Sequence, residues 1–122
     1  MLRGHFYFDL IRIFERIPYL TEDSDPNTTT SSEFTRTEIF DKIKKDFQYA
    51  WENLPESQEQ PGRFNKYVAA AYMAKLAVET KDWSTAIEFA DYVIGSHKYE
   101  LYDNYLDLSK IEFNNMKESV MA

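Results

Sequence analysis

Few side chains in this sequence have the type and spacing that catalysis or metal binding requires. The two histidines, His5 and His97, lie far apart, and neither belongs to an HExxH pattern or another metal-ligand spacing. The chain has no cysteine, which excludes thiol catalysis, disulfides and thiolate metal sites within it. We therefore predict no catalytic residue, no metal site and no cofactor, with His5 on a helix face and His97 in a turn.

An acidic segment at residues 23–27 (DSDPN) resembles the first half of a calcium-binding loop. Its sixth position is Thr28 instead of glycine, and its twelfth is Phe34 instead of glutamate. The sharp bend and the bidentate carboxylate of such a loop are therefore both missing, and we interpret the segment as a solvated acidic loop. Residues 27–29 (NTT) also match a glycosylation acceptor, a motif that is common by chance.

Carboxylates are numerous, with 21 Asp and Glu against 14 Lys and Arg, but their placement argues against catalysis. Glycoside hydrolysis needs two acids that face one cavity. The acids here lie mostly on polar helix faces or in loops, as Glu88 and Asp91 do beside Ala90. A solubilising polar face explains this charge pattern better, so we predict that the chain is not an enzyme.

Aromatic residues make up 16% of the chain, and flat rings are groups on which sugars can stack. An exposed ring could bind glycan, whereas a buried ring would serve packing. Trp51 and Trp83 fall within helical periods, which favours the core for both. Four tyrosines near segment ends leave the choice open: Tyr19, Tyr99, Tyr102 and Tyr105. The sequence therefore assigns no ligand-binding residue.

Length and charge narrow the class of protein further. At 122 residues, the chain fits one domain or a piece of a larger one. A net charge of −7 without a basic patch argues against nucleic acid as a partner. No apolar run approaches about 20 residues, so we expect no membrane insertion by this segment. No signal peptide is visible either.

Hydrophobic periodicity predicts a first helix at residues 2–17, which ends before Pro18 because proline disfavours helix at the preceding residue. Its apolar stripe consists of Leu2, Phe6, Leu10, Ile13, Phe14 and Ile17. Three more apolar residues widen this face: Tyr7, Phe8 and Ile11. We therefore expect this helix to be covered on more than one side. A polar loop at 21–32 follows it.

A second helix is predicted to begin at a capping box, with Thr35 as the N-cap and Glu38 three residues later. It runs to about Leu54, since Pro55 stops it. Its buried stripe is predicted at Ile39, Ile43, Phe47, Ala50 and Leu54. A second polar loop at 56–62 separates it from the next helix.

The most regular part of the sequence predicts a helical hairpin at 66–95, with helices at 66–80 and 83–94. Small residues recur at matching spacings on the two helices: Ala70, Ala74 and Ala77, then Ala86, Ala90 and Val93. Such residues let two helices approach closely, as in a tetratricopeptide-like hairpin. Asp82 fits the N-cap of the second helix and Gly95 the C′ position after it.

The C-terminal part is less regular. We predict a turn and a short helix within 97–108, a turn at Asn114 and Asn115, and the start of a strand at 117–122. A strand at a terminus without a partner would leave its amides unpaired. We therefore expect residues 1–122 to be one helical segment of a larger domain.

The order of these segments resembles the SusD/RagB family, glycan-binding surface lipoproteins of Bacteroidetes nutrient uptake systems. Four pieces carry the resemblance: RGHFYFDLIRIFERIPYLTE, TRTEIFDKIKKDFQYAWENLPES, GRFNKYVAAAYMAKLAVETKDWSTAIEFADYVIGSHKYELYDNYLDL and NNMKESVMA. No single piece is specific, but their order and spacing together are. Two positions depart from the family pattern: Glu15-Arg16 stands where Gly-Asp is common, and Trp51 is larger than the usual residue.

The resemblance implies an all-α fold of tetratricopeptide-like hairpins with long loops, as a fragment of a larger SusD-like protein. It implies oligosaccharide binding at the cell surface of the outer membrane, without catalysis. It also implies a SusC-like TonB-dependent transporter as partner and a lipidated N-terminal cysteine as anchor, which this chain lacks. No sugar-contacting residue of the family can be matched to a position here.

Two other interpretations remain open. A tetratricopeptide-type protein–protein interaction module would fit the hairpin, but such modules usually show several tandem repeats. Only Tyr67 to Ser96 fits a repeat clearly. A glycosidase would need paired acids in a cleft, and the sequence shows no such pair.

Overall fold

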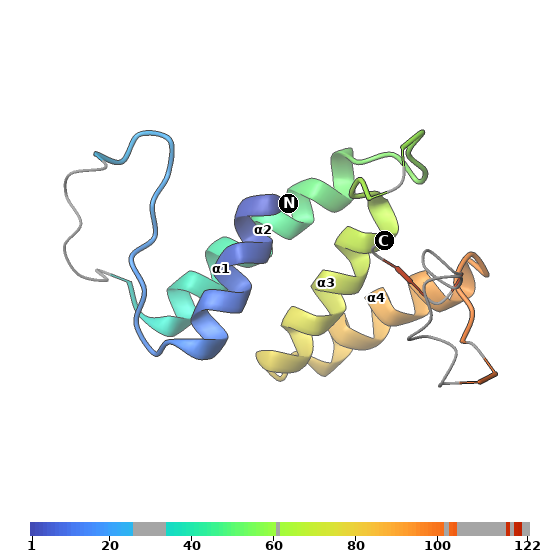
Figure 1. The fold of residues 1–122 in the computed structure, drawn as a ribbon. Coiled ribbons are helices and arrows are strands. Elements are labelled where there is room, and N and C mark those ends of the chain that lie inside the picture. The colour runs from blue at the N-terminus through green and yellow to red at the C-terminus, as the bar shows by residue number, and fades with distance from the viewer. Residues whose placement is uncertain (26–33, 61, 102, 105–116, 118, 121–122) are drawn as a thin grey trace.

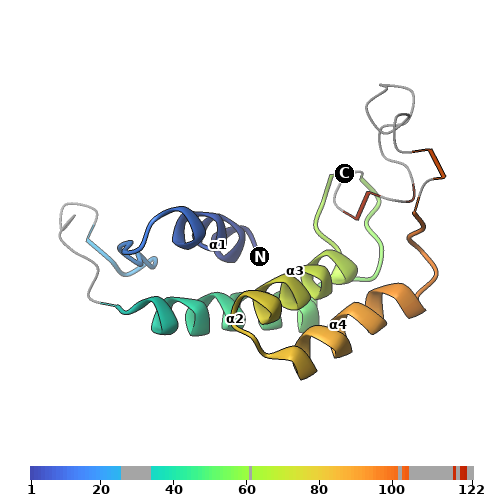
Figure 2. The ribbon, with the colours of Figure 1, turned by 90° about the horizontal axis from the view of Figure 1, so that it is seen from below.

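The computed structural model describes most of the chain: residues 1–25, 34–60, 62–101, 103–104, 117 and 119–120. These residues form four helices and no strand (Figure 1): α1 (Leu2–Ile13), α2 (Arg36–Asn53), α3 (Lys66–Glu79) and α4 (Trp83–Gly95). The helices pack in chain order, α1 on α2, α2 on α3 and α3 on α4. Figure 2 shows this succession from below. The all-α prediction is confirmed, as is the hairpin at 66–95.

The first helix ends earlier than predicted. α1 stops at Ile13, and Phe14 already has extended backbone, so the prediction of helix to residue 17 is wrong. The Arg36 guanidinium, from the first turn of α2, donates a short hydrogen bond to the Ile11 carbonyl, one of the terminal carbonyls that lack a partner within the helix. Ile17 is still buried, because the extended segment carries it back to the core.

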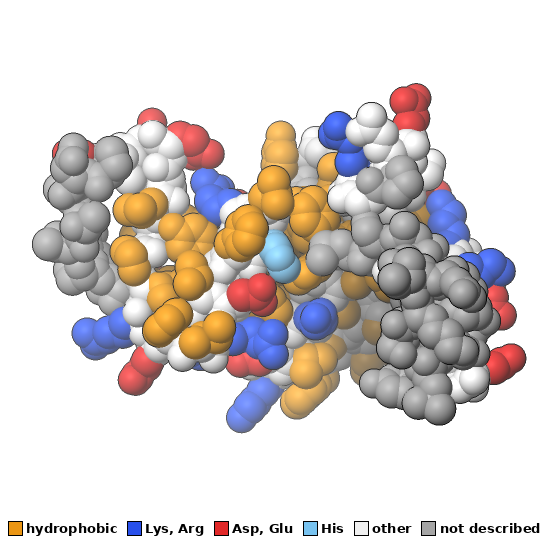
Figure 3. All heavy atoms as spheres, viewed as in Figure 1, with side chains coloured by type: hydrophobic (Ala, Val, Ile, Leu, Met, Phe, Trp, Pro, Cys, Tyr) orange, Lys and Arg blue, Asp and Glu red, His pale blue; other side chains and the backbone are white. Residues whose placement is uncertain are grey.

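The face of α1 that packs against the core is not the predicted one. Its buried residues are Gly4, Phe8 and Ile11. Five of the six predicted stripe residues are exposed instead: Leu2, Phe6, Leu10, Ile13 and Phe14. Figure 3 shows hydrophobic side chains, in orange, on the surface over α1. Apolar residues nearly encircle this helix, so periodicity alone could not select a face.

Gly4 explains which face of α1 was selected. A Cβ at this position would lie 2.8 Å from Cε1 of Phe47 and 3.1 Å from Cβ of Asp46. Glycine therefore lets the backbone of α1 approach α2 more closely than any other residue would. The face that carries Gly4 is the one that packs.

The second helix matches its prediction closely. The Thr35 hydroxyl accepts a hydrogen bond from the Glu38 amide at 3.3 Å, and the Glu38 carboxylate accepts one from the Thr35 amide at 2.8 Å. This reciprocal pair is the predicted capping box. Four of the five predicted stripe residues are buried, namely Ile39, Ile43, Phe47 and Ala50, and Leu54 is the half-buried C-cap.

The α3–α4 hairpin is built on small residues, as predicted. Ala70, Ala77 and Ala86 are buried, while Ala74 and Ala90 are half-buried. Their small side chains allow the two helices to pack closely. The predicted N-cap of α4 is confirmed too, because the Asp82 carboxylate accepts a hydrogen bond from the Thr85 amide. The equivalent cap of α3 is Asn65, which the sequence analysis did not name.

The end of α4 differs from the prediction. Gly95 is the last helical residue, and Ser96 after it keeps a right-handed helical backbone. His97 takes the left-handed conformation, with φ 52°, so the predicted C′ role of Gly95 is wrong and His97 makes the turn. The Ser96 hydroxyl donates to the Val93 carbonyl at 2.7 Å, which satisfies one terminal carbonyl.

Aromatic rings fill the centre of the core. Phe8 and Phe47 meet edge to face with centroids 6.2 Å apart, and the ring of Tyr72 lies 5.3 Å from that of Phe47. These three rings join α1, α2 and α3. Trp51 of α2 meets Phe89 of α4 edge to face at 5.2 Å. Aromatic pairs of this geometry add to the stability that area burial provides.

Part of the C-terminal prediction lies outside the described residues. Residues 97–101 hold no helix, and the rest of the short helix predicted within 97–108 is largely not described, nor is the turn at 114–115. Of the predicted strand at 117–122, Lys117 accepts a backbone hydrogen bond from Glu100 and donates its side chain to the same residue. These two bonds join the segment after α4 to the far end of the chain.

Candidate ligand-binding surfaces

The two histidines do not form a site. His5 is half-buried on α1 and contacts the rings of Phe6, Phe64 and Tyr72. Its Nδ1 is buried without a hydrogen-bond partner, and its Nε2 lies 3.9 Å from Asp9. His97 is exposed in the turn after α4. Among the described residues, no three His, Cys, Asp or Glu side chains are grouped to hold a metal ion.

The acidic segment at 23–27 is described only to Asp25. The Thr21 amide donates to the Ser24 hydroxyl at 2.9 Å, and the Ser24 amide donates to the Thr21 carbonyl at 3.1 Å. Asp23 and Asp25 are exposed, which agrees with a solvated acidic loop. The later positions of the calcium-like pattern and the acceptor triplet 27–29 lie outside the described residues.

The two tryptophans have different environments. Trp51 is half-buried against the core, between Phe89 and Tyr92, so its prediction as a packing residue is confirmed. Trp83 is 59% exposed, and its prediction as a core residue is wrong. It shares an exposed face of α4 with Ile87 and Ile94, four and eleven residues later, whereas Ala86 and Phe89 face the core.

Tyr99 packs near the start of α3. The Asn65 amide donates to its hydroxyl at 3.3 Å, and its ring lies 5.9 Å from that of Tyr67. Glu56 accepts hydrogen bonds from Tyr67 and from Lys98 there, and these bonds lower the pKa of the Glu56 carboxyl. Tyr99 therefore belongs to a cluster that joins three chain segments. Tyr102 and Tyr105 lie outside the described residues.

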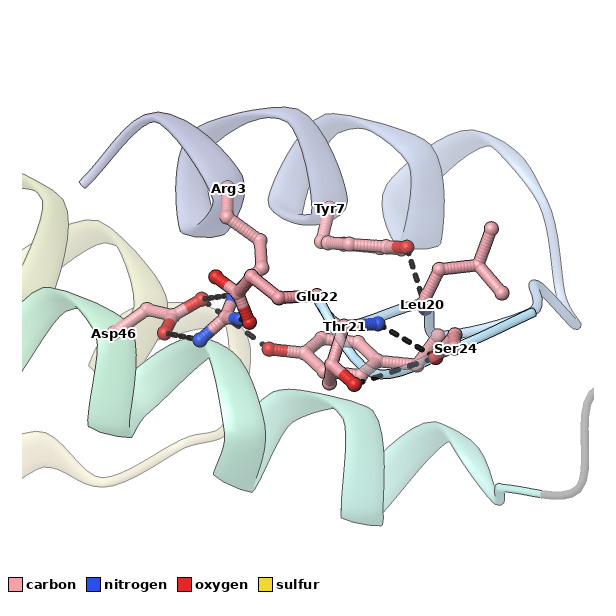
Figure 4. Close-up of polar contacts among 8 residues, drawn as sticks. Arg3, Tyr7, Leu20, Thr21, Glu22, Ser24 and Asp46 are labelled. Carbon is pink, nitrogen blue, oxygen red and sulfur yellow. Dashed lines mark hydrogen bonds and ion pairs between the residues drawn. The ribbon is translucent and has the colours of Figure 1, made fainter. Parts of the chain in front are cut away.

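Tyr19 belongs to a polar node that fastens the segment after α1 to α2 (Figure 4). Arg3 makes a bidentate ion pair with Asp46. Its Nε lies 2.8 Å from Oδ2 of Asp46, and its Nη2 lies 2.6 Å from Oδ1. The Tyr19 hydroxyl donates to the same carboxylate at 3.2 Å. Burial and the nearby Asp46 charge raise the pKa of Tyr19 to about 12. The Arg3 pKa also rises, chiefly through its hydrogen bond to Asp46.

Two neighbouring contacts extend this node. Arg3 also lies 3.3 Å from the exposed carboxylate of Glu22, and the Tyr7 hydroxyl accepts a hydrogen bond from the Leu20 amide at 2.8 Å. The rings of Tyr7 and Tyr19 lie 4.5 Å apart. Each polar group of the node thus serves another group of the same chain. The geometry makes it a structural anchor, because it offers no free acid, base or nucleophile.

A groove of about 460 Å³ lies between α2 and the turn that joins α3 to α4. Two ion pairs cross it from α2, Arg36 to Glu79 at 3.3 Å and Lys44 to Asp82 at 3.4 Å. Its floor is apolar, with Met73 among its residues. Pockets of this volume can hold a small ligand, but these four charged groups already have partners within the chain.

Asp82 is the most strongly held carboxylate of that groove. It accepts hydrogen bonds from the Thr85 hydroxyl, the Thr85 amide and the Ser84 hydroxyl. These bonds, led by the Thr85 hydroxyl, lower its pKa from 3.8 to about 2. The carboxylate is therefore kept ionised as a helix cap, which stabilises the N-terminus of α4.

The cap predicts a loss of stability in acid. Because the folded pKa of Asp82 lies below its unfolded value, the stabilisation is complete above that value and disappears as pH falls from about 4 to about 2. We expect Asp82→Asn, which keeps a capping side chain, to flatten the pH dependence of stability in this window, and Thr85→Ala to flatten it partly. Urea denaturation at several pH values measures the slope; slopes identical to wild type in both variants would contradict the assignment.

Fold and surfaces together define a class of protein, a helical scaffold of tetratricopeptide-like hairpins. The carboxylates of Asp46 and Asp82 serve contacts within the chain. None of the helices within the described residues is long and apolar enough to cross a membrane. The Arg3–Asp46 and Arg36–Glu79 pairs could not be predicted from the sequence, since each joins residues 43 positions apart and no local pattern signals them.

The chain belongs to the SusD-like family. The family model described as "Starch-binding associating with outer membrane" matches residues 1–78. A SusD-like protein P2 of Formosa agariphila is 34% identical over 96 residues, which cover 77% of this chain and 19% of that protein. A SusD-like protein of Bacteroides ovatus is 27% identical over 134 residues, which cover all of this chain and 24% of the relative.

Solved structures give the same assignment. A laminarin binding SusD-like protein matches with a TM-score of 0.89 and 27% identity, over 98% of this chain and 28% of its own. A SusD-like carbohydrate binding protein of Bacteroides fragilis matches with a TM-score of 0.71 over 88% of this chain and 22% of its own; at 24% identity it supports the fold alone. The chain thus spans about a fifth to just over a quarter of the length of these relatives. The family resemblance predicted from the sequence is confirmed. The description of the matched family names starch binding in association with the outer membrane, and one of the matched structures is named as a laminarin binding protein.

Proposed function

We propose that this chain is the helical scaffold segment of a SusD-like protein that captures oligosaccharide at the cell surface. The observation that carries the proposal is the match to the laminarin binding SusD-like protein, with a TM-score of 0.89 across 98% of the chain. In this proposal residues 1–122 form one segment of a larger domain, and the ligand is an oligosaccharide bound by the full-length protein.

The internal polar contacts support a scaffold role without catalysis. The node at Asp46 and the groove at Asp82 use their carboxylates to fasten helices and loops. Trp51 packs against the core. Among the residues that the structure describes, Trp83 is the exposed tryptophan, and it lies beside aliphatic residues of α4. A scaffold of this kind would hold the loops that contact sugar.

The transporter and the membrane anchor are finer parts of the proposal. A SusC-like TonB-dependent transporter would receive the glycan from the full-length protein, which a lipid anchor would hold at the outer membrane. The family description, starch-binding in association with the outer membrane, supports the location. The helical segment itself would enter no membrane.

Glycan binding is tested on the full-length protein that contains this chain. Affinity gel electrophoresis with laminarin, starch and several unrelated polysaccharides is expected to show retardation by at least one of them. A protein that binds none of them would contradict the proposal. Transporter delivery is tested separately, by purification from detergent-solubilised outer membranes. A glycan-binding protein that never co-purifies with a TonB-dependent transporter would contradict the delivery step alone.

A further inference from the structure

A second groove, of about 340 Å³, lies where α1, α3 and α4 meet. Its floor is formed by small and apolar side chains: Phe8, Ala74, Ala86 and Ala90. Phe8 is 2% exposed, so its ring belongs to the core and offers no face for stacking. Val78, which is 53% exposed, continues the apolar surface at the edge.

The rim of this groove carries an excess of positive charge. Arg12 and Lys75 line it, together with one carboxylate, Glu79. Glu79 is already paired with Arg36 at 3.3 Å. Within the described residues no carboxylate pairs with Arg12 or Lys75. The Arg12 guanidinium lies 5.3 Å from the centroid of the Phe8 ring, and Nζ of Lys75 lies 5.5 Å from that of Tyr72.

This combination differs from the groove between α2 and the α3–α4 turn. There, cations and carboxylates neutralise each other across the cavity. Here, two cations border an apolar floor in a chain whose net charge is −7. A surface that is apolar in the centre and charged at the rim is typical of protein–protein recognition.

The lining residues also discriminate between classes of ligand. They include no tyrosine or tryptophan on which a neutral sugar could stack, and the one aromatic ring among them, Phe8, is buried. An apolar side chain of a polypeptide would fill the floor, and a neighbouring carboxylate would pair with the cations at the rim.

We propose that the groove between α1, α3 and α4 is a docking site for a segment of a partner protein that carries apolar residues flanked by acidic ones. The apolar side chains lie on Ala74, Ala86 and Ala90, and the acidic side chains pair with Arg12 and Lys75. This inference does not depend on carbohydrate binding, since it concerns a different surface and a different class of ligand.

The test uses the full-length protein and three fluorescein-labelled helical peptides of equal length. One has a leucine stripe flanked by glutamates, the second replaces the glutamates with lysines, and the third keeps the glutamates but replaces the leucines with serines. Fluorescence polarisation is expected to show tight binding of the first peptide and at least about tenfold weaker binding of the other two. Equal affinity for all three, or binding of none, would overturn the proposal.

Variants of the protein locate the binding. Arg12→Gln with Lys75→Gln is expected to weaken binding of the acidic leucine peptide by about three- to tenfold and to reduce its salt dependence. Arg16→Gln with Lys45→Gln removes two exposed positive charges elsewhere and should leave the affinity unchanged. Ala90→Leu, which fills the floor, should also weaken binding. If the rim variant binds as wild type does, the site is not this groove, whatever the stability of the Ala90 variant.

Discussion

Replacement of Phe47 by alanine is expected to lower the free energy of unfolding by about 3–5 kcal/mol, the range found for such truncations in protein cores. The Phe47 side chain is fully buried. Its ring contacts those of Phe8 on α1 and Tyr72 on α3, and it lies against Gly4 of α1, where a Cβ would be only 2.8 Å from it. The cavity would therefore open between three helices at once.

A matched control on the same helix separates this effect from helix propensity. Tyr49, two residues away, is 69% exposed, so Tyr49→Ala should change stability by no more than about 0.5 kcal/mol. Phe47→Leu should fall between the two, because it keeps most of the apolar volume. Urea denaturation of the full-length protein followed by far-ultraviolet circular dichroism measures all three. A Phe47→Ala variant as stable as the Tyr49→Ala variant would contradict the core described here.

The second helix shows what periodicity can predict. Most of its apolar residues recur on one side, and Tyr49 is an exposed exception. Burial of the stripe from Ile39 to Ala50 therefore followed directly from the sequence. The capping box at Thr35 and Glu38 was equally local and equally predictable. Both features depend on residues that lie within a few turns of each other.

The first helix shows why the same method fails elsewhere. Apolar residues surround α1, so more than one face satisfied the period, and the predicted face proved to be exposed. The decisive residue was Gly4, whose missing Cβ permits the close contact with Phe47. Because glycine has no side chain, it contributes nothing to a hydrophobic pattern in the sequence.

The prediction that Trp83 lies in the core was wrong because α4, like α1, has apolar residues on more than one face. Its exposed face carries Ile87 and Ile94 beside Trp83.

The candidate surfaces were harder to predict than the helices. The absence of a catalytic or metal-ligand pattern could be stated from residue types alone, but the grooves arise from helices that are distant in sequence. Arg12 and Lys75 border one groove although they lie 63 positions apart in the sequence. The family itself was predictable from the order of segments, because that order reflects the whole fold instead of one site.

The second large effect is expected at Asp46, where a single carboxylate holds two partners. It accepts hydrogen bonds from Nε and Nη2 of Arg3, as Figure 4 shows, and one from the hydroxyl of Tyr19. Its side chain is only 13% exposed, whereas that of Arg3 is 38% exposed. The pair is therefore screened less than a surface ion pair but more than a fully buried one.

Asp46→Ala would leave a guanidinium and a phenol without their acceptor in a half-buried place. We expect the free energy of unfolding to fall by about 2 kcal/mol, between the cost of a lost surface pair and that of an orphaned buried charge. Asp41→Ala is the matched control: it lies on the same helix, is exposed, and makes the same gain in helix propensity. The difference between the two variants isolates the contacts of Asp46.

A double-mutant cycle between Arg3→Ala and Asp46→Ala shows whether those contacts are shared. If the two-pronged pair accounts for the loss, the double variant should be more stable than the sum of the single changes predicts, by about 1–2 kcal/mol. Additive losses would mean that Arg3 and Asp46 act independently. In that case the segment after α1 would be held mainly by the rings of Tyr7 and Tyr19, and Asp46→Ala would leave its attachment to α2 largely intact.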